Sequence, residues 1–491
     1  MSSNTTGSYN SAIGSQALRN STTGSGNTAL GYSSLKFTST GFNNTATGYS
    51  SLFRNTTGTY NVAFGVGALE NNTTGAGNSA IGNGALNSNV ANSGSLAIGQ
   101  NAMYYADSRT TGRNTGNTAV GYESLMGSST AANNTGQYNT ALGYESMKNK
   151  SSGSSNVAIG YQALFNDLVH TGSTAIGYQA MLNANNTSSF QYTEMTHNTA
   201  VGYKSLKGSP NPDVNTGKDN TAIGAYALTE NTTGFRNVSL GSLSSNKNTT
   251  GSYNTAIGSM ALWVNTTGSN NTAIGSMALE INTVGSYNTA IGEQAGSDLT
   301  TGNNNLILGY AAQSSTSSVS NEITLGNNNI TSFRANVQTI TSLSDARDKK
   351  NINDLTVGLN FINSLKPRIF NWDKRVWYKD GKSDGSKISK ENTAGFIAQE
   401  LDDSQNKFNA EWLKLVYKSN PNKWEATYGN LLPVIVKSIQ ELSNEKDKEI
   451  AELRDEKIKD KAEKDKEITE LKARIQSLEE LVNKALDAKK P

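Results

Sequence analysis

Apolar residues in the first 310 positions recur in short clusters at a fixed spacing, not in long helical or strand patterns. The phrase NTAIGSMAL at residues 254–262 returns at 271–279, and related phrases run through the whole segment. Measured on the glycine that closes the NTAIG phrase, twelve of the sixteen spacings are 17 residues, three are 22 and one is 25. These motif glycines are Gly14, Gly31, Gly48, Gly65, Gly82, Gly99, Gly121, Gly143, Gly160, Gly177, Gly202, Gly224, Gly241, Gly258, Gly275, Gly292 and Gly309. The alternative, low-complexity disorder, is disfavoured because disordered segments do not keep a period.

A 17-residue period suits one rung of a parallel β-solenoid. We expect a short strand at NTAIG, a turn at the glycine, a second short strand near the following Ala-Leu, and a corner at the NTTGSYN-like stretch. Strand alternation puts Thr255 and Ile257 on one face and Ala256 and Gly258 on the other. Either the isoleucines fill the rung and the small face packs on another chain, which we favour, or the reverse holds. We expect three copies of the chain to pack together as a homotrimer and so to cover the apolar face that a single rung leaves open.

Two further positions repeat from rung to rung. The corner asparagines Asn254, Asn271 and Asn288 predict either stacked amide ladders or turn chemistry. A tyrosine often follows the motif glycine, and its fixed place favours packing over ligand binding. These tyrosines are Tyr32, Tyr49, Tyr122, Tyr144, Tyr161, Tyr178 and Tyr203.

The four longer spacings predict loops on an otherwise regular shaft. They contain Tyr104, Tyr105, Phe190, Tyr192 and His197, which can stack on sugar rings or pack on protein. Contact with a receptor is one interpretation, and capping of local core is the favoured one.

After residue 310 the repeat gives way to NEITLGNNNITSFRANVQTI at residues 321–340. Apolar residues alternate through Ile323, Leu325, Ile330, Phe333, Val337 and Ile340. This alternation predicts strands of a narrow, intertwined neck over residues 311–343.

Composition excludes several classes of protein. The chain has 491 residues, no cysteine and only the histidines His170 and His197, so we expect no metal site and no cofactor. Residues 1–343 hold 13 basic and 13 acidic side chains, and residues 344–491 hold 29 basic and 27 acidic ones, so neither part has the basic excess that would predict a nucleic-acid partner.

No run of apolar residues approaches the length of a membrane span, and the start lacks a secretory signal. We therefore expect synthesis in the cytoplasm without membrane insertion.

The charged tail, residues 443–491, predicts long helices. Its last apolar residues are Ile468, Leu471, Ile475, Leu478 and Val482. Apolar residues that alternate spacings of three and four residues are typical of the interface, or seam, of a left-handed coiled coil. The preceding residues 454–467 are nearly all charged, so the seam is interrupted there.

Between neck and tail stand four ordered motifs. They read SDARDKKNI from Ser344, GLNFINSLKPRIFNW from Gly358, GFIAQE from Gly395 and YGNLLPVIVKSIQEL from Tyr428. This segment resembles the intramolecular chaperone domain at the C-termini of endosialidases and many phage tail spikes and fibres, the peptidase S74 family. The NTAIG repeats are similar to those in the trimeric heads of YadA-type adhesins, although the period there is shorter.

The resemblance implies that Ser344 is the nucleophile of a self-cleavage reaction, with Asp345 and Arg347 beside it and Lys349 as its partner. A serine needs a base, and an amine serves only when burial or nearby positive charge favours its neutral form. Ser344 can reach the preceding carbonyl through a five-membered ring, so the cut is expected at the Ser344 junction. Alone, this spacing would indicate a solvated charged turn, and some relatives of this kind remain uncleaved.

Together these observations predict a mainly β fold. A trimeric β-solenoid shaft (1–310) and β neck (311–343) precede a small α+β chaperone domain (344–442) and a helical coiled-coil tail (443–491). The expected function is a phage tail fibre or spike of the virion. Its expected partners are two further copies, a host surface glycan or protein, and other tail or baseplate proteins. A bacterial surface adhesin is the alternative. A glycan-degrading spike is disfavoured because 13 acids over 343 residues offer no recurring carboxylate pair.

Overall fold

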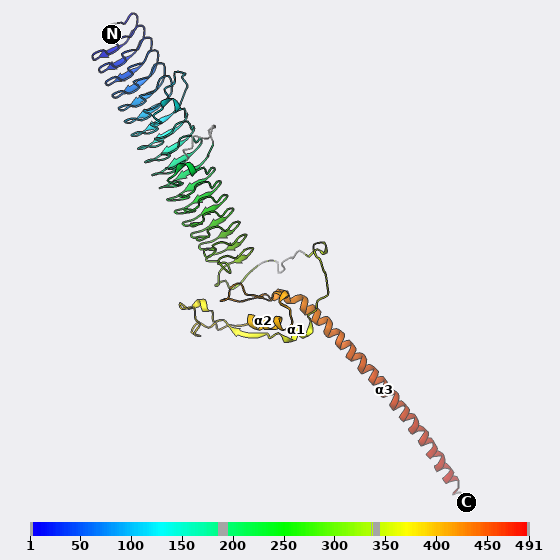
Figure 1. Ribbon diagram of the computed structural model, residues 1–491. Coiled ribbons are helices and arrows are strands. Elements are labelled where there is room, and N and C mark those ends of the chain that lie inside the picture. The colour runs from blue at the N-terminus through cyan, green and yellow to red at the C-terminus, as the bar shows by residue number, and fades with distance from the viewer. Residues whose placement is uncertain (1–2, 185–194, 335, 337–343, 489–491) are drawn as a thin grey trace. The chain divides into compact units, whose positions relative to one another are not determined.

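The computed structural model of the chain divides into two compact units, residues 1–334 and 335–491 (Figure 1). It describes residues 3–184, 195–334, 336 and 344–488. We treat each unit by itself.

The first unit is a parallel β-solenoid. Within the described residues, one three-residue strand from each rung pairs in parallel with the strand one rung away, so that Ala256 lies opposite Ala273. Figure 1 shows these strands stacked as a continuous sheet along the unit. The strands are β1 (Ser11–Ile13), β2 (Thr28–Leu30), β3 (Thr45–Thr47), β4 (Val62–Phe64), β5 (Ser79–Ile81), β6 (Leu96–Ile98), β7 (Thr118–Val120), β8 (Thr140–Leu142), β9 (Val157–Ile159), β10 (Thr174–Ile176), β11 (Thr199–Val201), β12 (Thr221–Ile223), β13 (Val238–Leu240), β14 (Thr255–Ile257), β15 (Thr272–Ile274), β16 (Thr289–Ile291), β17 (Leu306–Leu308) and β18 (Ile323–Leu325).

The rung interior is built from small residues, which reverses the arrangement that the sequence favoured. Ala256 and Leu262 are fully buried, whereas Thr255 and Ile257 are only partly covered. The small face of the strand therefore lies inside the rung, because the buried leucine of the following turn already fills the interior and leaves room only for alanine opposite it.

The expected second strand near Ala-Leu is absent from the described rungs. Met260 and Leu262 take left-handed φ values of 56° and 53°, which turn the chain instead of extending it. The backbone still bonds between rungs: the Leu262 N–H donates to the Ala278 carbonyl at 2.9 Å, and the Met260 N–H donates to the Ser242 carbonyl at 2.9 Å. The tight return of the chain thus keeps its hydrogen bonds without forming a strand.

The corner asparagines combine both predicted roles. The backbone N–H of Asn271 donates to Oδ1 of Asn254 in the next rung at 3.0 Å. Nδ2 of Asn254 donates to the carbonyl of Gly268 at 2.8 Å and closes the turn. Each side chain is buried, so it satisfies backbone groups that would otherwise lack partners.

A second asparagine column, which the sequence analysis missed, forms an amide ladder. Nδ2 of Asn265 donates to Oδ1 of Asn248 at 2.8 Å, and Nδ2 of Asn282 donates to Oδ1 of Asn265 at 3.2 Å. Stacked rungs repeat this bond without any change of register.

The tyrosines that follow the motif glycine pack on one another, as predicted. Tyr144 and Tyr161 stack with ring centroids 5.4 Å apart and an interplanar angle of 10°. The same stacking joins Tyr122 to Tyr144, Tyr161 to Tyr178, Tyr178 to Tyr203 and Tyr32 to Tyr49.

The solenoid continues one rung beyond residue 310. Gly326 lies 17 residues after Gly309, and β18 pairs in parallel with β17. Part of the segment expected to be neck is therefore a regular rung, in which Glu322 replaces the corner asparagine and donates its N–H to Oδ1 of Asn305 at 2.9 Å. Val337 and Ile340 of the expected neck lie outside the described residues.

The second unit contains a small α+β fold around a core of Val357, Phe361, Ala410, Leu413, Leu415, Leu431 and Val434. The helices are α1 (Leu359–Ser364), α2 (Ala398–Lys407) and α3 (Leu432–Asp487). The strands β19 (Arg368–Asn371) and β20 (Asn392–Gly395) form one antiparallel pair, and β21 (Val416–Tyr417) and β22 (Glu425–Ala426) form another.

Helix α3 is 56 residues long, about 84 Å at 1.5 Å per residue. It begins in the last chaperone motif, and so joins that motif to the charged tail without a break. The seam residues Ile468, Leu471, Ile475 and Leu478 are exposed in the single chain. No helix in the described part of the chain combines the length and apolar character needed to cross a bilayer.

Candidate functional site

Ser344 and Lys349 lie on either side of a single 3-10 turn, Ala346–Asp348. Nζ of Lys349 donates to Oγ of Ser344 at 2.5 Å. The five-residue spacing thus brings nucleophile and amine into contact, because the short turn folds the chain back on itself. Base activation of a serine requires this proximity, with the amine in its neutral form accepting the hydroxyl proton.

Asp345 and Arg347 hold the turn together. The Asp345 carboxylate accepts the Arg347 backbone N–H at 2.8 Å, and Oδ2 also pairs with Nη2 of Arg347 at 2.6 Å. These hydrogen bonds lower the pKa of the Asp345 carboxyl below its usual value. The Arg347 charge is therefore compensated by Asp345, and the pair acts to position the turn.

All four site residues are exposed in the single chain. Leu343, whose carbonyl Ser344 would attack, lies outside the described residues. An amine acts as a base when burial or nearby positive charge favours its neutral form, and the described part of the single chain leaves this site open to solvent.

The three downstream motifs meet one another in the folded domain. Their contacts are Leu359 N–H to Oε2 of Glu441 at 2.7 Å, Nη2 of Arg368 to Oε1 of Glu400 at 2.5 Å, and Phe396 N–H to the Tyr428 hydroxyl at 3.1 Å. The motifs that the sequence placed far apart thus share one fold, and α3 is anchored to it through Glu441.

The aromatic residues predicted in the longer rungs have different surroundings. Tyr104 and Tyr105 pack edge to face with centroids 4.9 Å apart. Nδ1 of His197 lies 3.5 Å from Oδ1 of Asp219. Phe190 and Tyr192 lie outside the described residues. The described contacts are local, between neighbouring residues or rungs.

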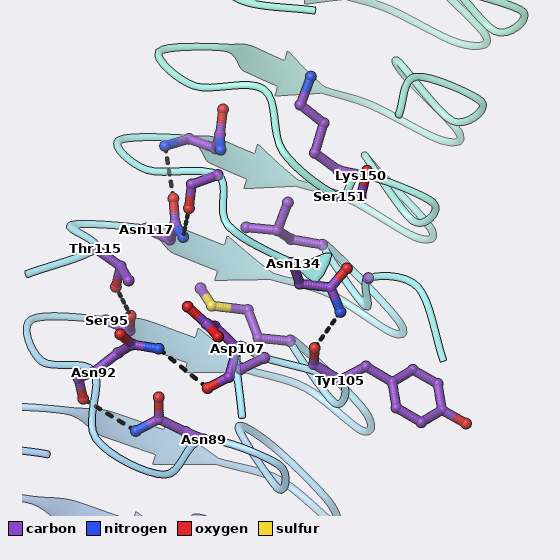
Figure 2. A pocket seen from close by; sticks show the side chains of 16 residues that line it. Asn89, Asn92, Ser95, Tyr105, Asp107, Thr115, Asn117, Asn134, Lys150 and Ser151 are labelled. Atoms are coloured by element: carbon purple, nitrogen blue, oxygen red, sulfur yellow. Dashed lines mark hydrogen bonds between the residues drawn. The ribbon is translucent and has the colours of Figure 1, made fainter. Parts of the chain in front are cut away.

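Beneath Tyr105 the first pair of longer rungs encloses a polar cavity of about 30 Å³ (Figure 2). The Tyr105 ring points away from it, while the Tyr105 carbonyl accepts a hydrogen bond from Asn134. Asp107 is buried at its wall, paired with Arg109 at 2.6 Å and Arg113 at 3.2 Å. The cavity has room for water and none for a sugar ring.

A larger open groove of about 350 Å³ runs along the outside of the shaft. It is lined by Arg54, Asn71, Thr73, Ser88, Val90, Ser108 and Ala131. Ser108 and Ala131 belong to the longer rungs, so the loops form one wall of the groove. The aromatic residues of the loops did not point to this surface, because none of its lining side chains is aromatic.

Comparison with known families bears on the second unit. Residues 344–409 match Peptidase S74, the chaperone of endosialidase. No curated protein and no solved structure matches the chain. A chaperone-of-endosialidase domain that follows a β-solenoid shaft supports a protein of tail-spike or tail-fibre type.

Proposed function

We propose that the chain is a homotrimeric phage tail fibre or tail spike that attaches to the host surface. Its C-terminal chaperone aligns the three shafts and then cuts itself off at Ser344. The observation that carries this proposal is the Lys349–Ser344 contact of 2.5 Å at the start of the matched chaperone segment.

Trimer formation is supported by two apolar surfaces that the single chain leaves uncovered. The residue before the motif glycine faces outward on the sheet, and many of these side chains are exposed. They include Ile13, Leu30, Phe64, Ile81, Leu142, Ile223, Leu240 and Ile291. The second surface is the α3 seam. Contiguous exposed apolar surface of this kind marks a protein interface.

We propose that self-cleavage proceeds as an acyl shift. The Lys349 amine removes the Ser344 Oγ proton, and Oγ attacks the Leu343 carbonyl carbon through a five-membered ring. The peptide C–N bond then breaks, its nitrogen takes the proton, and an ester joins Leu343 to Ser344. Water hydrolyses the ester to a Leu343 carboxylate and a free Ser344 hydroxyl.

The chaperone solves an alignment problem that the shaft creates. Three chains of similar 17-residue rungs can pair out of register at small cost. A domain that trimerises first tethers the chain ends and presents them in register. Cleavage afterwards removes the template and makes the folded shaft slow to unfold.

Host attachment is supported by the groove beside the loops of the longer rungs. Its volume of about 350 Å³ and the hydrogen-bonding side chains of Arg54, Asn71 and Thr73 in its lining suit a surface glycan. A host protein and other tail or baseplate proteins remain part of the proposal as partners.

The test of the proposal is a denaturing gel of the full chain beside Ser344→Ala and Lys349→Ala. The native chain should give two bands, of about 343 and 148 residues, because Ser344 and Lys349 act as one unit. Both variants should give one band at full length.

Lys350→Ala is the matched control, since it removes a neighbouring lysine that does not contact Ser344. It should cleave like the native chain. A single band for the native chain, or equal cleavage in Lys349→Ala and Lys350→Ala, would refute the dyad.

A further inference from the structure

One interior column of the solenoid is asparagine in many rungs and an ion pair in two of them. The column lies seven residues after the motif glycine. Its asparagines are Asn55, Asn72, Asn89, Asn231, Asn248, Asn265 and Asn282. The same position holds Lys150 after Gly143 and Asp167 after Gly160.

Lys150 and Asp167 form a buried pair that takes the place of two stacked amides. Nζ of Lys150 lies 2.7 Å from Oδ2 of Asp167, and both side chains are at most 1% exposed. Nζ also donates to the carbonyl of His170 at 2.5 Å. The second carboxylate oxygen of Asp167 accepts the His170 backbone N–H at 3.1 Å. Both charges are thus satisfied inside the solenoid, but only by each other and by His170.

The two kinds of column respond differently when the chain skips a rung during folding. In the asparagine rungs, Asn248 would meet Asn282 instead of Asn265 and form the same amide bond. If the rung of Asp167 were looped out, Lys150 would instead face Ala184, which occupies this column one rung further on. A buried ammonium group without a counter-charge is strongly destabilising.

We infer that the Lys150–Asp167 pair fixes the rung register within each chain. The pair joins the rung of Gly143 to the rung of Gly160, and this contact between neighbouring rungs differs chemically from every contact between two asparagines in the column. This inference concerns register inside one chain, so it stands independently of trimer formation and of self-cleavage.

Disulfide trapping tests the inference, because the chain has no native cysteine. Side chains 145 and 162 lie one rung apart, since Nε2 of Gln162 donates to Oε2 of Glu145 at 2.8 Å. Glu145→Cys with Gln179→Cys therefore places two thiols two rungs apart, about 9.6 Å at the spacing of adjacent strands, beyond disulfide reach. A chain that skips the intervening rung brings them together.

The variant is Lys150→Asn with Asp167→Asn, which restores an asparagine column and removes the pair. Both chains carry the two cysteines and are purified and oxidised at full length. We expect the yield of the disulfide between residues 145 and 179 to be about tenfold or more higher in this variant than in the chain that keeps Lys150 and Asp167. Peptide mass spectrometry measures its yield. Lys150→Asn alone should instead lower the yield of folded chain, because Asp167 is left buried without its partner.

The matched control lies in rungs that contain only asparagine in this column. Leu243→Cys with Met277→Cys should give the same disulfide yield whether or not the Lys150–Asp167 pair is present. Asn248→Lys with Asn265→Asp transplants a pair into these rungs and should lower that yield. The inference would be overturned if the disulfide between residues 145 and 179 formed in equal yield with and without the Lys150–Asp167 pair. It would also be overturned if neither removing this pair nor transplanting it changed any disulfide yield.

Discussion

Single residues decide how closely the rungs approach. At Gly258 the backbone has φ +134°, and a Cβ built there would lie 2.5 Å from the Gly275 carbonyl oxygen. The motif glycine is therefore required both by conformation and by space, and this is why its spacing revealed the period so clearly.

Gly258→Ala should destabilise the shaft by about 3 kcal/mol or more, from backbone strain and displacement of the next rung. Thermal unfolding followed by circular dichroism measures the change. Gly77→Asn is the control: Gly77 has open space around it, and Asn43 and Asn270 already adopt a left-handed φ at the same rung position. A Gly258→Ala midpoint equal to that of the native chain would contradict this account of rung packing.

The Asp167 carboxyl makes shaft stability sensitive to acid. Burial alone would raise its pKa, but the charge of Lys150 and hydrogen bonds from His170 and Lys150 hold the pKa well below 3.8. Because the folded pKa is depressed, the stabilisation is present above pH 3.8 and is lost as the pH falls below it.

Between pH 7 and pH 3 the native chain should therefore lose about 1 kcal/mol more stability than the Lys150→Asn, Asp167→Asn variant. Denaturant unfolding at a series of pH values measures this difference. Other carboxylates, such as Asp107, are common to both chains and cancel. Parallel loss of stability in the two chains would show that the pair is not the acid-sensitive group.

At the scale of elements, the longer rungs form two similar modules. In each, an asparagine pins the extra loop: Oδ1 of Asn134 accepts the Ser128 N–H at 2.9 Å, and Oδ1 of Asn215 accepts the Ser209 N–H at 3.0 Å. A short 3-10 turn lies in each loop, Ala131–Asn133 and Pro212–Val214. These two described loops are therefore ordered parts of the shaft that change its outer surface without breaking the sheet.

Helix α3 is the element whose apolar residues most need a partner. Ile468→Asp with Ile475→Asp should reduce trimer formation by the full chain, because two charges enter the proposed seam. Size-exclusion chromatography with light scattering measures the change. Glu470→Lys, which alters charge at a position facing away from the seam, should leave the mass unchanged. A trimer that persists in the double variant would exclude α3 from assembly.

The sequence predicted the features that depend on the repeat period and on the order of the motifs. It did not predict which side chains lie inside a rung. Glycine spacing was sufficient to predict the solenoid, and the neighbouring motifs singled out Ser344 and Lys349, whose side chains are in contact. The inward face was not predictable, because alternation of Ala256 with Ile257 divides the faces without saying which is enclosed. The buried pair could have been found by aligning rungs on the glycine, since Lys150 and Asp167 then stand in a column of asparagines.

At the scale of the whole molecule, the two units have opposite properties. The shaft is a stack of near-identical rungs with an uncovered apolar face, whereas the second unit has a distinctive core and a long helix. Contacts within the shaft repeat along its length, so they specify rung stacking better than they specify the alignment of three chains. The account assigns that alignment to the second unit.

The central claim is tested most directly by producing residues 1–334 without the second unit, beside the full chain. Sedimentation analysis and resistance to detergent measure whether native three-chain rods form. The account predicts detergent-resistant trimers from the full chain, and aggregated or misaligned material from residues 1–334. Native, detergent-resistant trimers of residues 1–334 alone would contradict it.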